Sequence, residues 1–332
     1  EDCFNFHNAI IQEIVPIITL FEQKRKDKLG YRSYKPWDTA VDVNGLAPLN
    51  PFEGGTQLTD LSIECFNRLR PYFGECFSIM KDMKHLDLES KNGKAPGGFM
   101  YPLYEIGVPF IYMNAVGSQR DLVTMVHEGG HAIHSFLSRD LSLTEFKSTP
   151  SEVAELASMS MELLSMDNWD VFYSDDNDLK RAKLDQLKKV LEGLPWIAAI
   201  DKFQHWIYTT EHTAKKRKEK WLEIYVELEN QILDWHGQEN VHANLWQRQL
   251  HLYEVPFYYI EYGMAQLGAI AMWKSYKELG EEAIDNYMSA LKLGYTKSIS
   301  EIYETAGIKF DFSASYVKEL AEFIKEELAL LE

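Results

Sequence analysis

Residues 124–136, TMVHEGGHAIHSF, decide the fold of this chain because they combine a metal-binding spacing with a helical pattern. His127 and His131 are four residues apart, so on a helix they lie about 40° apart around the axis and one turn apart along it. Both imidazoles can then reach one ion. Glu128 points about 100° away from His127, beside the pair. This His-Glu-x-x-His pattern predicts one Zn²⁺ per chain, with a carboxylate next to the open position of the metal.

A zinc site of this kind needs a third protein ligand, which we expect from the segment STPSEVAELASMSMELL at 148–164. Thr149, Pro150 and Glu152 are typical of a helix start, with Thr149 as N-cap, Pro150 at the first helical position and Glu152 completing a capping box. This interpretation gives Glu152 a structural task. The next carboxylate, Glu155, is therefore the predicted third ligand, and Glu152 is the alternative.

Two further side chains near these ligands have competing interpretations. Glu162 lies two turns beyond Glu155, where it would orient a ligand histidine or remain a solvated helix residue. His134 shares a face with His127, but one straight helix cannot arrange three ligands tetrahedrally around an ion. We therefore expect His134 to be a packed neighbour.

The two glycines of the histidine segment each cost about 1 kcal/mol in a helix relative to alanine. Gly130 borders the histidine face, where we expect that a side chain would crowd the metal or what approaches it. Gly129 points to the opposite side, where we expect another element to approach the backbone closely.

Helical periodicity dominates the rest of the chain, so the predicted fold is mainly α, as one domain over residues 1–332. The exception is 97–117, where Gly and Pro separate short β-branched and aromatic runs and predict a small β-sheet just before the histidine-bearing helix. The helical stretches are 3–25, 57–85, 118–139, 150–165, 177–212, 215–236, 256–278, 281–293 and 312–331.

Composition excludes several classes of partner. A formal charge of −17 disfavours nucleic acid and anionic membranes, which bind through Lys and Arg. Cys65 and Cys76 lie too far apart along one predicted helix to bridge, and with Cys3 they make an odd number, so we expect a reduced, cytoplasmic setting. Because the sequence starts at Glu1 inside an apolar-periodic segment, we expect it to be a fragment or processed piece.

The segments around the predicted metal site resemble the oligoendopeptidase F and thimet oligopeptidase family of zinc metallopeptidases. The resemblance spans much of the chain, and the two segments around the metal carry it most specifically. The matching segments are YKPWDTAVD (35–43), GKAPGGF (93–99), PFIYMNAVGSQRDLVTMVHEGGHAIHSF (109–136), SEVAELASMSMEL (151–163) and HLYEVPFYYIEYGMAQLGA (251–269).

The resemblance implies a mostly helical catalytic domain around a deep channel, with His127, His131 and Glu155 as zinc ligands and Glu128 as general base. The chain departs from the family at Gly129, where a bulky apolar residue is more common. Family members usually carry a helical N-terminal region that forms the far wall of the channel, and we expect that region to be missing here or separate. A separate N-terminal portion of the same protein is therefore an expected partner.

The segment HLYEVPFYYIEY places His251, Tyr258, Tyr259 and Tyr262 on one helical stripe. A stripe at this spacing is more often core than catalytic. The resemblance reverses that preference, because the family places a His and several Tyr hydroxyls from this segment over the zinc. His251, Tyr259 and Tyr262 are therefore the further catalytic candidates, with Tyr262 favoured as the oxyanion donor and Tyr258 expected to pack or to touch substrate.

The predicted function is a zinc endopeptidase that hydrolyses short unstructured peptides by attack of water, with Glu128 as general base. The segment 110–114 is expected either to pair with the substrate backbone as an added strand or to be an ordinary internal strand. The alternative functions are a zinc exopeptidase and a non-catalytic peptide-binding metal domain or inactive catalytic half.

Overall fold

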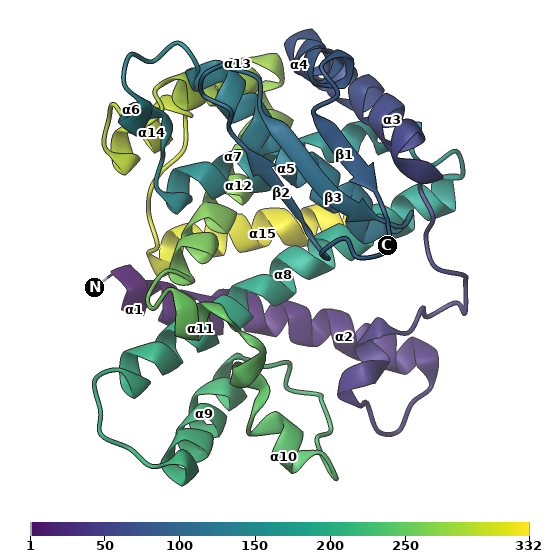
Figure 1. The fold of residues 1–332 in the computed structure, drawn as a ribbon. Helices are drawn as coiled ribbons and strands as arrows, with labels where there is room; N and C mark the ends of the chain where they lie inside the picture. Colours follow the sequence, from purple (N-terminus) through teal and green to yellow (C-terminus); the bar gives the residue numbers. More distant parts are fainter. Residues whose placement is uncertain (1, 332) are drawn as a thin grey trace.

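The computed structural model describes residues 2–331, and helices form most of it (Figure 1), as the sequence predicts. Elements of the first half are α1 (Asp2–Ala9), the π-helical η1 (Ile10–Ile14), α2 (Val15–Leu29), η2 (Pro36–Ala40), α3 (Gly54–Leu69), α4 (Pro71–Asp82), β1 (Leu86–Glu89), β2 (Gly98–Tyr101), β3 (Phe110–Ala115), α5 (Gln119–Ser138), α6 (Thr144–Lys147) and α7 (Ser151–Leu164). Elements of the second half are η3 (Ser165–Val171), α8 (Asp176–Ile207), α9 (Ala214–Leu228), α10 (Glu239–His242), η4 (Leu245–Arg248), α11 (His251–Glu254), α12 (Ile260–Leu279), α13 (Glu281–Lys292), α14 (Ile299–Thr305) and α15 (Ala314–Leu331).

The predicted small sheet lies beside α5 and, within residues 2–331, has the strand order β1-β3-β2. Strand β3 pairs in parallel with β1 and antiparallel with β2, with Met100 opposite Ile111. Both edges of β3 are therefore occupied, so of the two alternatives for 110–114 the structure bears out the internal strand and contradicts the added substrate strand. Within residues 2–331, the outer edges of β1 and β2 pair with no further strand.

The predicted helix over 57–85 is two helices, α3 and α4. Arg70 between them is extended, with φ −159° and ψ 125°, because proline at 71 disfavours the helical conformation of the preceding residue. Cys65 and Cys76 consequently lie on different helices, which corrects the reason given for their not pairing. Both are free and buried.

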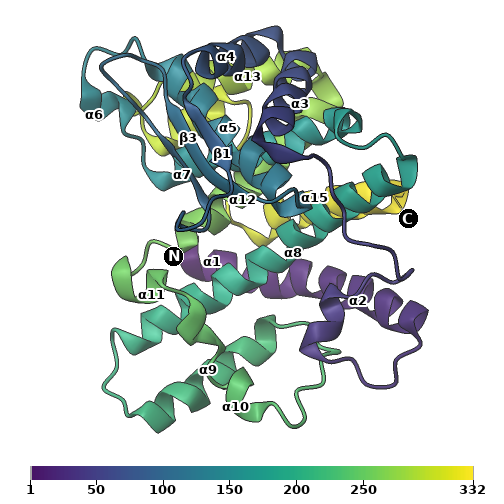
Figure 2. The ribbon, with the colours of Figure 1, turned by 45° about the vertical axis from the view of Figure 1, so that its right-hand side comes forward.

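Helix α8 passes between two halves of the molecule (Figures 1 and 2). The sheet and helices α3–α5, α7, α12 and α13 lie above it in these views, while α9, α10 and α11 lie below it. Along α8 pack α1, η1, α2, α12 and α15, together with α9 from below. At 32 residues, α8 is about 48 Å long and reaches from one part of the candidate site to the opposite side of the molecule.

Two helices are shorter than the periodicity predicts. Helix α9 ends at Leu228, although the pattern continues to 236, and α12 begins at Ile260, after the proline-containing segment 255–259. No helix within residues 2–331 has the length and apolar character needed to cross a membrane.

Candidate active site and metal centre

Helix α5 presents the two histidines of the opening motif. Ser118 caps the helix by accepting a hydrogen bond from the Asp121 backbone N–H, while the Asp121 carboxylate accepts one from the Ser118 N–H. This reciprocal cap fixes where the helix starts. Two turns later the His127 and His131 rings lie with centroids 5.0 Å apart and planes nearly perpendicular.

Helix α7 brings a carboxylate to these histidines. The Oε2 atom of Glu155 lies 3.4 Å from Nε2 of His127 and 3.7 Å from Nε2 of His131. One donor atom from each of the three residues lies within 4.8 Å of the other two. Zinc–ligand bonds of about 2.0–2.1 Å in a tetrahedral site place neighbouring donors about 3.4 Å apart. The spacing of these nitrogen and oxygen atoms therefore fits one tetrahedral zinc ion with a fourth position left for water or substrate.

The start of α7 differs from the prediction. The N-cap is Pro150, its side chain makes no capping hydrogen bond, and Thr149 lies outside the helix, so the expected capping box of Thr149 and Glu152 is wrong. Proline at the cap has no side-chain oxygen to offer. Glu152 contributes its backbone carbonyl to the Tyr303 hydroxyl at 2.8 Å. Glu155 still provides the donor oxygen, although the argument that singled it out fails.

The two glycines bring α5 against its neighbours. A Cβ on Gly130 would lie 2.5 Å from the Ala157 carbonyl oxygen and 2.6 Å from Ser158 Cα, both in the backbone of α7. Gly130 therefore permits the close approach of α5 and α7, and the α7 backbone is what a side chain at this position would crowd. A Cβ on Gly129 would lie 2.6 Å from the Phe66 ring, which agrees with the predicted close packing on that side.

A hydrogen-bond chain supports His127 from behind. Nδ1 of His127 lies 2.6 Å from Oε1 of Glu162, so the contact considered for Glu162 is present. The other ring nitrogen of His127, Nε2, is directed at Glu155. Gln186 of α8 donates to the other Glu162 oxygen at 2.6 Å. Such partners fix the ring orientation of a metal-binding histidine. No sequence pattern points to Gln186, because it lies on a separate helix without a recognisable spacing to the motif.

The pKa shifts give Glu155 and His131 the protonation states that bind zinc, whereas His127 would have to lose a proton on binding. Burial opposes ionisation of Glu155, but the hydrogen bond to His127 and the charges of both histidines lower its pKa to about 2. Burial lowers the pKa of His131 to about 4. Burial also acts to lower the pKa of His127, but hydrogen bonds to Glu155 and Glu162 outweigh it and raise that pKa well above its usual range. An ionised carboxylate and a neutral imidazole are the forms that bind zinc.

Glu128 lies next to the donor group without belonging to it. Its side chain is buried, and burial raises its pKa above the usual range, while a backbone hydrogen bond from Met100 of β2 lowers it. The carboxylate thus faces the strand whose outer edge is free. His134, by contrast, is buried with Nε2 lacking a hydrogen-bond partner among the described residues, and burial lowers its pKa to about 4.

The aromatic stripe forms one cluster on α11, α12 and the segment between them. The ring of His251 lies 6.0 Å from that of Tyr258, 5.0 Å from Tyr259 and 5.7 Å from Tyr262. Burial and a hydrogen bond to Tyr258 raise the pKa of Tyr262, and the charge of Glu155 raises it further. The charge of Glu155 thus affects the pKa of Tyr262 and not that of Tyr259. Tyr258 also meets α7, where it accepts a hydrogen bond from Ser151 at 2.6 Å.

Tyr259 has different neighbours. Burial raises its pKa to about 12, and its hydrogen-bond partner is the Trp196 side chain on α8. Trp196 also donates to Gln249 at 2.9 Å, and Gln249 contacts Nδ1 of His251 at 2.7 Å. Trp196 and Gln249 thus hold the histidine end of the cluster. Sequence reasoning missed both, because neither has a spacing that relates it to the stripe.

Comparison with known proteins extends these observations to the whole chain. A protein-family sequence model, described as peptidase family M3, matches residues 1–322 of this chain. An oligoendopeptidase F homolog of Borreliella burgdorferi is 25% identical over 297 residues, which cover 86% of this chain and 49% of that protein. An oligoendopeptidase F homolog of Lactococcus lactis subsp. lactis is 23% identical over 335 residues, which cover 100% of this chain and 55% of that protein.

Solved structures agree with the fold. PZ peptidase A, determined with an inhibitor, superposes with a TM-score of 0.90 at 28% identity, over 99% of this chain and 58% of that one. A structure titled as an oligoendopeptidase F from Bacillus anthracis superposes with a TM-score of 0.84 at 26% identity, over 100% of this chain and 56% of that one. The chain spans about half the length of the relatives it matches.

Proposed function

Because the chain belongs to peptidase family M3, we propose that it is the catalytic part of a zinc endopeptidase that cuts short, unstructured peptides. The observation that carries the proposal is the meeting of His127, His131 and Glu155, whose donor atoms have the separations of a tetrahedral zinc site. Glu128 beside this group supplies the carboxylate that peptide hydrolysis requires.

In this proposal His127, His131 and Glu155 hold one zinc ion. Zinc bound there would act as a Lewis acid toward a water molecule and the scissile carbonyl. Glu128 accepts the proton of the attacking water and delivers it to the leaving amine. Its burial supports this role, because a raised pKa makes a carboxylate a better base near neutral pH.

The stripe of aromatic residues stabilises the negative oxygen that develops during attack. Tyr262 is the proposed donor, supported by its electrostatic interaction with Glu155 and its hydrogen bond to Tyr258. His251 and Tyr259 remain proposed catalytic residues, with His251 either a second donor or the group that holds Tyr262 through ring contact. A donor aimed at the oxyanion contributes little before the charge forms.

The substrate backbone lies along the free edge of β2 in this proposal. The interaction of the Met100 backbone with Glu128 supports it, since it brings that edge next to the base. In an antiparallel ladder alternate residues direct their N–H and C=O groups away from the partner strand. An extended peptide can therefore add to β2 and pass its scissile bond over Glu128.

Partners and location follow from the same reasoning. Half-length coverage of the relatives supports a separate N-terminal portion that completes the channel and restricts substrates to short peptides. The formal charge of −17 gives no support to nucleic acid or membrane binding. Free thiols at Cys3, Cys65 and Cys76 support a reducing, cytoplasmic setting.

Metal analysis combined with cleavage of an internally quenched peptide library tests the proposal. We expect one catalytic zinc per chain and internal cleavage, whereas a ladder of products shortened from one end would support the exopeptidase alternative. Glu155→Ala should release this zinc and abolish cleavage, and the matched variant Glu152→Ala should retain both. Zinc retained by Glu155→Ala and lost from Glu152→Ala would overturn the ligand assignment. A zinc-replete chain that binds peptides without cutting any would favour the non-catalytic alternative.

A further inference from the structure

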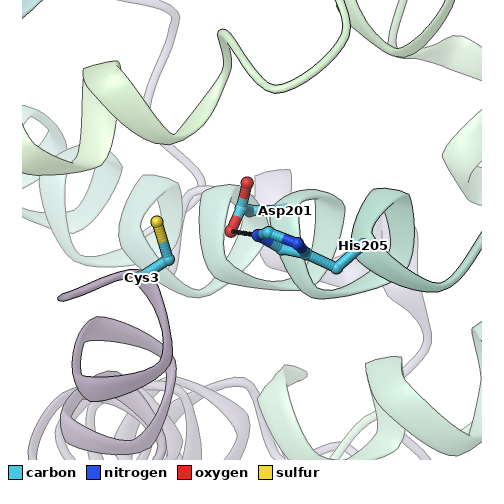
Figure 3. A group of neighbouring side chains, drawn as sticks. All are labelled: Cys3, Asp201 and His205. Carbon is cyan, nitrogen blue, oxygen red and sulfur yellow. Dashed lines mark ion pairs between the residues drawn. The ribbon is translucent and has the colours of Figure 1, made fainter. Parts of the chain in front are cut away.

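A second group of metal-ligand side chains lies below α12, far along α8 from the Gln186 end. Cys3 of α1 faces Asp201 and His205 of α8 (Figure 3), and one donor atom from each lies within 4.8 Å of the other two. Nε2 of His205 lies 3.3 Å from Oδ2 of Asp201, which is close to the edge length of about 3.4 Å expected between neighbouring zinc ligands.

The charge of Asp201 points to a cation. Its side chain is 1% exposed, and its hydrogen-bond partners are His7 Nε2 at 2.8 Å and Gln204 Nε2 at 2.8 Å. Within residues 2–331, no lysine or arginine forms an ion pair with it. A buried carboxylate is costly unless it is paired with a positive charge or coordinates a metal. The candidates for that charge are a protonated imidazole and a metal ion.

The chemistry of the group favours the metal. Thiolate, imidazole and carboxylate are the three ligand types that zinc takes in proteins. Hydrogen bonds from His7 and Gln204 orient the Asp201 carboxylate, as outer partners do for metal ligands. The His205 side chain is 33% exposed, which gives an ion a route from solvent.

We propose that Cys3, Asp201 and His205 form a second divalent-metal site, suited to Zn²⁺, that joins α1 to α8. Binding releases the thiol proton of Cys3 to solvent and forms a metal–thiolate bond. The site also adjoins the aromatic stripe, because Gln204 accepts a hydrogen bond from the Phe257 N–H at 2.8 Å.

Titration of the metal-free chain with Co²⁺ tests the site, because a thiolate ligand gives cobalt a charge-transfer absorption that oxygen and nitrogen ligands do not. We expect two Co²⁺ per chain and a thiolate band that accompanies one of them. Cys3→Ser should lose the band and bind one Co²⁺. His205→Asn, at a partly exposed position, should weaken this binding by at least the 10–100-fold that loss of an outer partner costs. Cys76→Ala, which removes another buried thiol, should keep both ions and the band.

Glu155→Ala separates this site from the proposed active site, since it should lose the other Co²⁺ and keep the thiolate band. His7→Phe should keep the band and weaken the affinity about 10–100-fold. Absence of a thiolate band from the wild-type chain would overturn the proposal and assign the counter-charge of Asp201 to a protonated imidazole. A band that survives in both Cys3→Ser and His205→Asn would also overturn it.

Discussion

The two groups of metal-ligand side chains differ in how the chain assembles them. His127 and His131 come from one helix at a spacing that fixes their relation before tertiary structure forms, and Glu155 follows on the next long helix. Cys3 and His205 come from opposite parts of the sequence and meet only when α1 packs on α8. Local geometry makes the first group readable from sequence, whereas only the fold reveals the second.

Helix α8 serves both groups. Gln186 supports the Glu162–His127 contact, and Asp201 lies fifteen residues further along the helix, about 22 Å away. One group is proposed to perform chemistry and the other to join helices, and both contact α8. Variants that change only one group support this division of roles. Variants that change both groups equally contradict it.

The largest contrast is expected from Glu128→Gln. Glutamine keeps the shape of the side chain but cannot accept a proton, so turnover should fall by about 10²–10⁴-fold while zinc content persists. Cys3→Ser, in the second group, should change the turnover of an internally quenched peptide substrate by less than about twofold, compared with the loss expected for Glu128→Gln. Full turnover in a zinc-replete Glu128→Gln enzyme, or an equal loss in Cys3→Ser, would break the comparison.

The next contrast concerns the tyrosines. Tyr262→Phe removes one hydroxyl and leaves the ring packing nearly unchanged, so kcat and kcat/KM should fall together by about 10²–10³-fold. Tyr259→Phe tests the second tyrosine of the stripe, and we expect a smaller loss there because the hydroxyl it removes has Trp196 as its partner. Steady-state kinetics distinguishes the outcomes. A Tyr262→Phe variant that changes only KM would assign the stripe to substrate binding.

Acid stability gives a third contrast, through the neutral histidine His134 on the catalytic helix. Its pKa is lowered by burial to about 4 in the folded protein, against about 6.5 in an unfolded chain. The unfolded state therefore binds the proton first, and stability present above pH 6.5 is lost as pH falls toward 4, by about 3 kcal/mol. Urea denaturation at a series of pH values gives the free energy of unfolding. Between pH 6.5 and 4 this free energy should fall more steeply for the wild-type chain than for His134→Gln. Equal falls in the two chains would contradict the prediction.

The smallest effect is expected where α8 supports the active site. Glu162→Gln and Gln186→Leu should each weaken zinc binding at His127 and His131 by about 10–100-fold. The cobalt–thiolate band of the second group should not change. Competition with a chelator measures the affinity, and equal weakening of both groups would show that α8 transmits the change along its length.

Local periodicity predicted the helical class and the segment that holds β2 and β3, whereas β1 (Leu86–Glu89) lies outside that segment. The spacing of His127 and His131 predicted that they lie together, and Glu155 lies with them although the capping argument for it fails. The expected capping box of Thr149 and Glu152 does not form because Pro150 is the N-cap and not the first helical residue. The expected helix over 57–85 breaks at Arg70 because Pro71 follows it. These errors come from signals that were present in the sequence.

Other features had no such signal. Strand β3 could not be identified as the central strand, because pairing order depends on which segments meet across the sheet. The contact of Gly130 with the α7 backbone depends on how closely two helices approach. Gln186 and Trp196 reach the site from α8, and nothing in their own sequence neighbourhood relates them to it.

The distribution of the three free cysteines makes the chain suitable for selective chemical labelling. Cys65 and Cys76 are fully enclosed, and burial raises the pKa of each thiol, that of Cys76 to about 12. Cys3 is partly exposed and is therefore the first thiol that an alkylating reagent reaches in the metal-free chain. A fluorophore attached there would report on the junction of α1 with α8 without any cysteine being engineered.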